Sequence, residues 1–477
     1  MTRHLQIIHR VTTMTSSTDP RQLLAEALAP LGVHRVECAM ADFSSLARGK
    51  LVSRDEFLSL GGCKLPSVLL GMGITGGAPS DIFGTVLPKG YSDVMLVPDL
   101  ETLVQRPGRP GEATVLCEPR GGWYSEHLGR EVDSAELSPR GALRRVMAAY
   151  AEAGLQAMVA PELELFLLQR DPAPGSTLVT SAKAWPDAPG RESACEQYSL
   201  ERSTQFDPYF DELYPACEQL SIPITGHLHE AALSQFEVNF KPGAPLAQAD
   251  AVFRFKRVAR EIAQRHGFLA SFAAKPFEDQ PGTGMHWHFS VQRTQGDLAW
   301  PHLFANPDGS STPALAHFIG GLQAHVPGAM ALLAPYDMSF DRIVMSDASP
   351  THADWADEDR HAAFRIPASG PQARRVENRL PGGDVNPYLA VALTMGLGLS
   401  GLRAAQAART GRDEAMRLPR SLPDALDALL GSAAAREWLG DPLVELYVAI
   451  KRQEHHERQS QAHPRQQWDL RHLIELA

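Results

Sequence analysis

Two short stretches of the chain alternate ionisable side chains with large apolar ones. "APELELFLL" alternates Glu162 and Glu164 with leucines, and "GTGMHWHFS" alternates His286 and His288 with Met, Trp and Phe. Successive side chains of a strand point to opposite faces, so each stretch predicts a strand with one apolar face and one polar face. Burying carboxylates or imidazoles unpaired is costly, so the polar faces need water, a hydrogen-bond partner, a metal ion or a phosphate beside them. For either stretch by itself, an ordinary strand whose polar face is exposed to solvent remains an open alternative.

Two further segments could supply partners for these strands. "HLHEAALSQFEVNF" carries Glu230 in a loop and Glu237 on the following strand, and "QARRVENRL" places Arg375, Glu377 and Arg379 on one face of a strand. Four such segments together are harder to explain as solvent-exposed strand faces than a single segment is. The chain therefore offers six side chains that could ligate metal ions: Glu162, Glu164, Glu230, Glu237, His286 and Glu377.

The chemistry of these candidate ligands points to hard cations. Oxygen-rich sites with a single imidazole suit Mg²⁺ or Mn²⁺ better than a structural zinc ion, and six ligands can be divided between two ions. Two hard cations beside arginines suit a transferring phosphoryl group, because arginine supplies a fixed charge and a planar fork for phosphate or carboxylate. A single arginine is more often a surface residue, so the prediction depends on the cluster: Arg342, Arg360, Arg365, Arg375 and Arg379.

Charge and apolar patterning narrow the class of protein. The net charge of -11 over 477 residues argues against a nucleic-acid or anionic-membrane partner. The five cysteines are scattered without a CxxC, which indicates neither a disulfide framework nor a zinc knuckle. The longest uncharged apolar stretch, residues 387–402, is too short and glycine-rich for a membrane span and predicts a buried helix. The N-terminus lacks an apolar run long enough for a signal sequence, so we expect a cytoplasmic enzyme or binding protein.

The order of the expected strands and helices predicts an α+β fold. We expect a loose tail over residues 1–17, a small strand-rich N-terminal domain over 18–130 and a large mixed catalytic domain over 131–477. Strands are expected at residues 34–43, 92–99, 112–119, 158–168, 234–240, 271–277, 285–291 and 372–380. Helices are expected from Ser138 as N-cap to Gly154, at 251–266, 314–326 and 386–408, and over most of the chain after 422, with 121–138 as a connector.

These segments, in this order, resemble the glutamine synthetase superfamily. The most specific pieces are "PELELFLL", "KPFEDQPGTGMHWHFS", "RIPASGPQARRVENRLPGGDVNPYLA" and "SDVMLVPD", and the resemblance extends from about residue 34 to the C-terminus. "ADFSSLARGKLV", "EQYSLERSTQF" and "SQFEVNF" are similar in content and position to the γ-glutamylputrescine (γ-glutamylpolyamine) synthetase branch.

The resemblance implies an activity, a fold and an assembly. In this family ATP phosphorylates the γ-carboxylate of L-glutamate, and ammonia or an amine attacks the acyl phosphate. The implied fold has a small β-grasp-like N-terminal domain and a catalytic domain with helices around a curved antiparallel sheet. Two Mg²⁺ or Mn²⁺ ions per site and ATP as co-substrate are implied. The implied assembly is a homo-dodecamer of two stacked hexamers with active sites between neighbouring subunits.

Carried onto this sequence, the resemblance implies a role for each candidate residue. One metal ion would be held by Glu164, Glu230 and Glu237, and the other by Glu162, His286 and Glu377. ATP would be contacted by His288, Ser290, Arg365 and Arg375. The transferring phosphate would face Arg360, and glutamate would be held by Arg342, Arg379 and the backbone at Gly282. The amine pocket of a neighbouring subunit would be reached by Asp93.

The chain departs from the family at the position that handles ammonium. Glutamine synthetases carry a flap glutamate six residues after the arginine that matches Arg342, and here that position is Ala348, with Asp347 as a partial substitute. The "FDGSS" motif of the ammonium site is also missing, and Asp81 is a weak stand-in. Both departures weaken the ammonium interpretation and favour a bulkier amine.

Three hypotheses of different classes follow. The first is an ATP-dependent ligase that joins glutamate to a polyamine or another primary amine. The second is a glutamine synthetase that uses ammonium, against which Ala348 counts. The third is a non-catalytic structural or glutamate-sensing relative, against which the complete set of six metal ligands counts, because a sensor need not retain so many costly carboxylates.

We expect Ala348→Glu to raise the use of ammonium relative to the use of amines. The substitution restores the flap carboxylate, which in the family helps to take a proton from ammonium. ADP release with ammonium and with each amine, measured for the variant and the parent protein, gives the ratio. An unchanged ratio would remove the flap argument.

Overall fold

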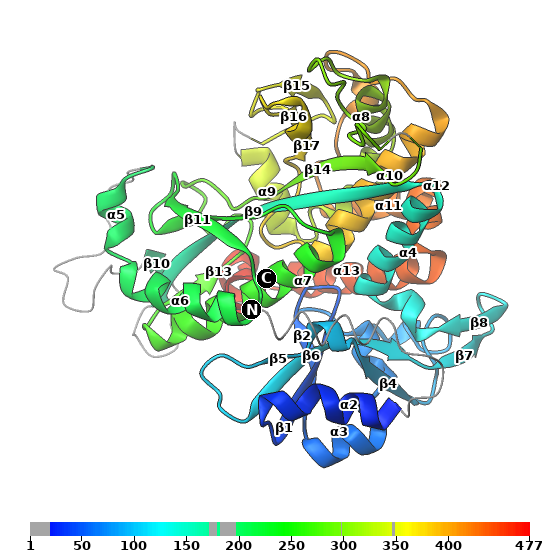
Figure 1. Cartoon of the computed structure of the whole chain (residues 1–477), viewed down its shortest axis with the longest axis vertical. Helices are drawn as coiled ribbons and strands as arrows, with labels where there is room; N and C mark the ends of the chain where they lie inside the picture. Colours follow the sequence, from blue (N-terminus) through cyan, green and yellow to red (C-terminus); the bar gives the residue numbers. More distant parts are fainter. Residues whose placement is uncertain (1–19, 171–178, 182–196, 297, 346–348) are drawn as a thin grey trace.

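The computed structural model describes residues 20–170, 179–181, 197–296, 298–345 and 349–477, and these form two large sheets, a two-stranded hairpin and helices packed around them (Figure 1). The smaller sheet has the strand order β2-β1-β6-β4-β3, with β5 beside β6. Its strands are β1 Arg35–Ala41, β2 Ala47–Ser53, β3 Cys63–Pro66, β4 Asp93–Pro98, β5 Val104–Gln105 and β6 Glu112–Arg120. β1 and β6 are parallel, and the other pairs are antiparallel. The three strands expected here are confirmed.

Two helices in this N-terminal region were not anticipated. They are α2 Pro20–Leu28 and α3 Arg54–Leu60, and α3 packs against β1, β2 and β3. Ser53 caps α3 by accepting a hydrogen bond from the Glu56 N–H, and Phe57 is the buried residue of the helix. The expected strand-rich region is therefore confirmed for the sheet, but the expectation did not include the two helices beside it.

The larger sheet is built around one long strand. Its order is β11-β12-β9-β14-β17-β16-β15, with β10 and β13 also paired to β9, which crosses the centre of the molecule (Figure 1). Its strands are β9 Leu155–Arg170, β10 Val179–Ser181, β11 Ile224–His229, β12 Gln235–Phe240, β13 Leu269–Ser271, β14 Met285–Arg293, β15 Trp355–Asp357, β16 Phe364–Ile366 and β17 Val376–Asn378. All pairs are antiparallel except β15 with β16. The α+β class and the mainly antiparallel larger sheet are as expected.

Two expected strands are only partly present. The strand expected at 271–277 is wrong beyond Ser271, where β13 ends, because the backbone there bonds to a loop: Thr283 N–H donates to the Ala274 carbonyl at 2.9 Å. The strand expected at 372–380 is reduced to β17, preceded by the 3₁₀ turn Pro371–Ala373. Residues expected to form a connector contain a hairpin, β7 Gly122–Ser125 with β8 Arg130–Asp133.

Helices cover the apolar face of the larger sheet. The helices beyond residue 138 are α4 Pro139–Glu152, α5 Leu200–Thr204, α6 Asp207–Gln219, α7 Pro245–Arg265, α8 Pro313–His325, α9 Asp337–Met345, α10 Pro387–Ala404, α11 Leu422–Gly431, α12 Ala433–Leu439, α13 Asp441–Gln459 and α14 Leu470–Leu476. The expected start of α4 is confirmed, since the Ser138 hydroxyl accepts from the Gly141 N–H and Pro139 is the first helical residue. α7 begins six residues earlier and α10 ends four residues earlier than expected.

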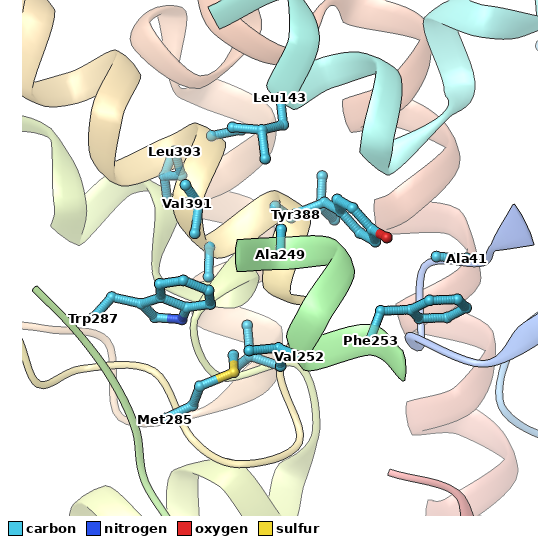
Figure 2. Close-up of a cluster of buried hydrophobic side chains, with 14 of the residues drawn as sticks. Ala41, Leu143, Ala249, Val252, Phe253, Met285, Trp287, Tyr388, Val391 and Leu393 are labelled. Atoms are coloured by element: carbon cyan, nitrogen blue, oxygen red, sulfur yellow. The ribbon is translucent and has the colours of Figure 1, made fainter. Parts of the chain in front are cut away.

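One hydrophobic core joins the two sheets (Figure 2). Trp287 and Met285 point from β14 towards Val252 on α7 and Val391 on α10, and Trp287 is fully buried. Ala41, at the end of β1, belongs to the same cluster. Apolar burial therefore holds the N-terminal sheet and the larger sheet in one body.

A buried ionic cluster adds a second link between the sheets. The Arg140 guanidinium, on α4, donates to both carboxylate oxygens of Asp250 on α7 at 2.8 Å, to Glu118 on β6 at 3.0 Å and to Asp99 at 2.7 Å. The Tyr388 hydroxyl also donates to Asp250, at 2.7 Å. A buried charge is tolerated only when it is paired in this way.

Two other expectations concern the whole chain. No helix in the described part of the chain is long and apolar enough to cross a membrane, and the stretch at 387–402 is the buried helix α10, as expected. The boundary expected at residue 130 falls at the first residue of β8 and stays a prediction. The tail over residues 1–17 lies outside the described residues.

We expect Gly321→Ala to destabilise the protein by about 1–3 kcal/mol, the usual cost of overpacking. Gly321 lies where α8 crosses α10, and a Cβ there would lie 2.7 Å from the Gly401 Cα and also against the Leu397 carbonyl. Thermal unfolding followed by circular dichroism measures the effect. Gly431→Ala is the matched control, because a Cβ on that exposed helix residue meets nothing within 4 Å. Equal melting temperatures for the two variants would contradict the close crossing.

Candidate active site

Strand pairing brings the predicted metal ligands onto one face of the larger sheet. Residues directly opposite each other on paired strands point to the same face. The register places three candidate pairs opposite each other: His286 with Glu162, Glu237 with Glu164, and His288 with Glu377. Glu230 follows the last residue of β11, and its carboxylate accepts hydrogen bonds from the Ala231 N–H at 2.8 Å and the Gln197 amide at 3.0 Å. The sheet thus gathers all six predicted ligands in one region.

Two groups of ligand atoms lie close enough to hold a metal ion. In each group, one atom from every residue lies within 4.8 Å of the others: Glu162, Glu237 and His286 form one group, and Glu162, His288 and Glu377 form the other. These groups differ from the two trios that the family resemblance implies. Glu162 belongs to both groups, so it lies between them. The assignment of each ligand to a particular ion stays a prediction.

A glycine leaves room for two of the ligands to approach each other. A Cβ on Gly284 would lie 2.6 Å from the His286 Nε2 and 3.0 Å from a carboxylate oxygen of Glu164. Both distances are shorter than an ordinary contact, so a side chain at this position would push the imidazole or the carboxylate away. Gly284 therefore makes the close approach possible.

Crowding of like charges shifts the pKa values of the carboxyls. Burial, together with the charges of Glu230 and Glu237, raises the pKa of Glu164 to about 8. Burial and the charge of Glu162 raise the pKa of Glu237 to about 7. Burial also raises the pKa of Glu230, although its hydrogen bonds from Ala231 and Gln197 and the charge of Arg360 act in the opposite direction. Burial acts in the same direction on Glu162, but the His288 hydrogen bond and nearby arginines prevail and lower its pKa.

The imidazole of His286 is held neutral. Burial, with the positive charges of Arg379 and Arg342, lowers the pKa of His286 well below its ordinary value. A neutral imidazole and deprotonated carboxylates are the forms that ligate a metal ion, and a dication would relieve the repulsion among the carboxylates. The donor set therefore fits a divalent cation with a preference for oxygen ligands, such as Mg²⁺ or Mn²⁺.

Arginines lie beside this cluster. The buried Glu377 carboxylate accepts from the Arg365 Nη1 at 2.8 Å and from the Arg379 Nη1 at 2.5 Å. The Arg379 Nε in turn donates to the Arg360 carbonyl at 3.0 Å. The exposed Arg360 guanidinium acts on the pKa values of several of the carboxyls. Positive charge therefore lies beside the acidic cluster on β16, directly after β17 and in the loop before β16.

Two of the residues predicted to hold glutamate, Arg342 and Gly282, are neighbours in the structure. Arg342, on α9, is buried and donates to the Leu380 carbonyl at 3.0 Å, and burial lowers its pKa. A Cβ on Gly282 would collide with the Ala274 carbonyl and would lie 3.1 Å from the Arg342 Cγ. The loop at Gly282 therefore packs against α9 only because the residue is a glycine.

A cavity opens beside the predicted nucleotide contacts. It has a volume of about 440 Å³, and its lining includes Glu162, His288, Ser290 and Arg375. The Arg375 Nε donates to the His288 Nδ1 at 3.2 Å, so Nε2 carries the proton and donates to Glu162 at 2.9 Å. Pockets of a few hundred Å³ with a few convergent polar groups are typical of small-molecule sites. Arg365, by contrast, is engaged by Glu377 and Glu358.

One predicted position belongs to the N-terminal sheet, and two are not described by the structure. Asp93 begins β4 of the N-terminal sheet and is exposed, so its role in a neighbouring subunit's site stays a prediction. Ala348 and Asp347, on which the flap argument depends, lie outside the described residues.

Three residues near the cluster were not anticipated. Gln235 donates to Glu164 at 2.9 Å, Asn239 donates to Glu237 at 2.8 Å, and Gly284 gives room to His286. The alternation in "QFEVNF" would have placed Gln235 and Asn239 on the same face as Glu237, so a signal was present. Nothing in the sequence indicated the close approach at Gly284.

We expect the affinity for Mn²⁺ to increase as the pH rises from about 6 to about 8. Glu164 and Glu237 bind protons in this range because their pKa values are raised to about 8 and about 7. Protons and metal compete for the carboxylates, so binding at neutral pH should release protons. Calorimetric titration in two buffers of different ionisation enthalpy measures the release, and Glu164→Gln should reduce it. An affinity that is flat over this range would contradict the raised pKa values.

Comparisons with known proteins agree with the arrangement. A family model described as the catalytic domain of glutamine synthetase matches residues 136–471. The gamma-glutamylputrescine synthetase PuuA of Escherichia coli (strain K12) is 29% identical over 430 residues, which covers 88% of this chain and 88% of that protein. The glutamine synthetase of Methanocaldococcus jannaschii is 31% identical over 381 residues, covering 76% of this chain and 79% of that protein. The solved structure of a GmaS/ADP complex matches with a TM-score of 0.75 at 26% identity, covering 94% of this chain and 98% of that chain. The chain therefore belongs to the glutamine synthetase family.

Proposed function

We propose that this protein is an ATP-dependent ligase that joins the γ-carboxylate of L-glutamate to a primary amine or a polyamine of the putrescine type. The observation that carries the proposal is the cluster of Glu162, Glu237 and His286 on one sheet face, with arginines and a cavity of about 440 Å³ beside it. Membership of the family supports an ATP-dependent reaction of glutamate with an amine or ammonia.

The reaction in this proposal has two steps. A γ-carboxylate oxygen of glutamate attacks the terminal phosphorus of ATP, the bond to ADP breaks, and γ-glutamyl phosphate forms. The amine nitrogen then attacks the acyl carbon, phosphate leaves, and the nitrogen loses a proton as the amide forms. Divalent cations, when bound, would offset the negative charge of the phosphates.

The chain's own residues bring the two anions together. Arg342 and Arg379 would hold the carboxylates of glutamate, and Arg360 would face the transferring phosphoryl group. Their charge lowers the repulsion between carboxylate and phosphate, which is the main barrier that the protein can act on. His288, Ser290 and Arg375 would contact ATP in the cavity beside the sheet. Holding the acyl phosphate away from water would favour the amine over hydrolysis.

Two features favour an amine over ammonium. One is the replacement of the family's flap glutamate by Ala348, and the other is the similarity to a gamma-glutamylputrescine synthetase over 88% of both chains. Ammonium is the second candidate, because a glutamine synthetase is 31% identical to this chain. The dodecameric ring with shared active sites and the cytoplasmic location stay predictions.

The proposal is tested by ADP release with ATP, Mg²⁺ or Mn²⁺ and L-glutamate. The acceptor panel contains ammonium, putrescine, spermidine, spermine, ethanolamine and short monoamines, and the product is confirmed by mass. We expect one amine to be preferred, and we expect Glu162→Ala and His286→Ala to lower the rate at least about 100-fold by removing a ligand. Both variants should keep the assembly of the parent protein, which gel filtration checks.

Each outcome is informative. Preference for ammonium would make the protein a glutamine synthetase and would show that Ala348 was misinterpreted. Full activity of either variant would contradict the assignment of that residue as a metal ligand. If folded and assembled protein releases no ADP with any acceptor, the non-catalytic alternative would be favoured.

A further inference from the structure

The side chain of Gln235 lies at the junction of three segments of the candidate site. Its Nε2 donates to a Glu164 carboxylate oxygen at 2.9 Å and to the Gly282 carbonyl at 2.9 Å. Its Oε1 accepts from the Ala232 N–H at 3.0 Å. Gln235 is 1% exposed, so all three bonds are made away from bulk water.

Only one orientation of this amide satisfies all of its partners. The carboxylate of Glu164 and the carbonyl of Gly282 are acceptors, and the backbone N–H of Ala232 is a donor. Turning the amide by half a rotation would place its oxygen against two acceptors and its NH₂ against a donor. A buried unsatisfied group costs about 1–3 kcal/mol, so the amide is fixed in direction as well as in position.

The backbone of Gln235 fixes the third segment. Its carbonyl accepts from the Glu230 N–H at 2.8 Å, and the loop between Glu230 and Gln235 is held again by Gln280, whose side chain accepts from the Leu233 N–H at 3.0 Å. One residue therefore contacts the Glu164 strand, the Gly282 loop and the loop that carries Glu230.

We propose that Gln235 is a positioning residue that sets the Glu164 carboxylate and the Gly282 carbonyl relative to each other, so that metal binding and glutamate binding depend on the same amide. The inference rests on the proposed function and on the roles that the family resemblance implies, in which Glu164 ligates a metal ion and the Gly282 backbone contacts glutamate. An amide suits this position because it is a neutral donor. A carboxylate would repel Glu164, and an apolar side chain would leave the carboxylate and the carbonyl without their donor.

A second buried glutamine provides the matched control. Gln323, on α8, is 3% exposed. Its amide is also fully used, since it donates to the Arg409 carbonyl at 3.0 Å and accepts from the Arg409 N–H at 2.8 Å. Gln323 contacts no predicted site residue through these bonds. The same substitution at the two positions therefore removes similar hydrogen bonds from similar burial but touches the site only at Gln235.

The variants are Gln235→Met and Gln235→Asn, with Gln323→Met and Gln323→Asn as controls. Methionine keeps the length and removes the hydrogen bonds, and asparagine keeps the amide but shortens its reach. Mn²⁺ binding is measured without substrates by electron paramagnetic resonance, and KM for L-glutamate and for ATP is measured by ADP release. Thermal unfolding checks that each variant is folded. We expect both Gln235 variants to weaken Mn²⁺ binding and to raise KM for glutamate by about 10–100-fold, the usual effect of losing a partner of a metal ligand. KM for ATP should change far less, because Gln235 does not line the cavity.

Four results would count against the inference. Wild-type Mn²⁺ affinity and glutamate KM in a folded Gln235 variant would overturn it while leaving the proposed function intact. Equal losses in the Gln323 controls would assign the effect to general destabilisation and would also overturn it. Failure of both Gln235 variants to fold, with folded controls, would make the residue structural. A parent protein that binds no Mn²⁺ would overturn the proposed function first and this inference with it.

Discussion

The antiparallel pairing of β9 with β14 is the constraint on which the rest of the structure depends. It runs from Met285 opposite Leu163 to Arg293 opposite Leu155, and it places Trp287 in the core while His286 lies opposite Glu162. Because the side-chain period of a strand is two, a slip of one residue would turn the ionisable groups towards α7 and α10 and the apolar groups towards the arginines. The free energy of burying Trp287 and its neighbours therefore fixes the register, and the register fixes the candidate site.

Polar contacts at buried positions hold the N-terminal sheet against this framework. Arg140 joins β6 to α4 and α7, and the Asn386 amide donates to the Asp42 carbonyl at 2.8 Å. Glu454, on α13, accepts from the Ile74 N–H at 2.6 Å and from Lys451 at 2.8 Å. Each of these groups is costly to bury alone, so their pairing specifies one way for the N-terminal region to dock. A common hydrophobic core alone would be less selective, because apolar contacts have no direction.

The candidate site works against the stability of the fold. Several carboxylates share one sheet face, and burial with mutual repulsion raises the pKa of Glu164 to about 8 and of Glu237 to about 7. Arginines offset part of this repulsion at Glu377 and Glu162, whereas Glu164 accepts a hydrogen bond from the neutral amide of Gln235. Such crowding has no use in a purely structural sheet, and strongly shifted pKa values of this kind gather at functional sites. A bound dication would remove the conflict that the protein alone leaves in place.

The sequence by itself determined the parts of this protein that follow local rules. The alternation of side chains predicted β9, β12 and β14 and the face that each ionisable residue occupies, and the Ser138 cap predicted the start of α4. The spaced motifs indicated the family, which the comparisons show. What only the tertiary structure decided is which distant residues meet. Arg375 bonds to His288 and Gln235 bonds to Gly282, and neither pairing has a sequence period. The strand expected beyond Ser271 was lost for the same reason, because its backbone bonds to the loop at Thr283. The alternation of side chains is a property of the local sequence, whereas the packing of the whole core determines which residue 40 to 90 positions away becomes a partner.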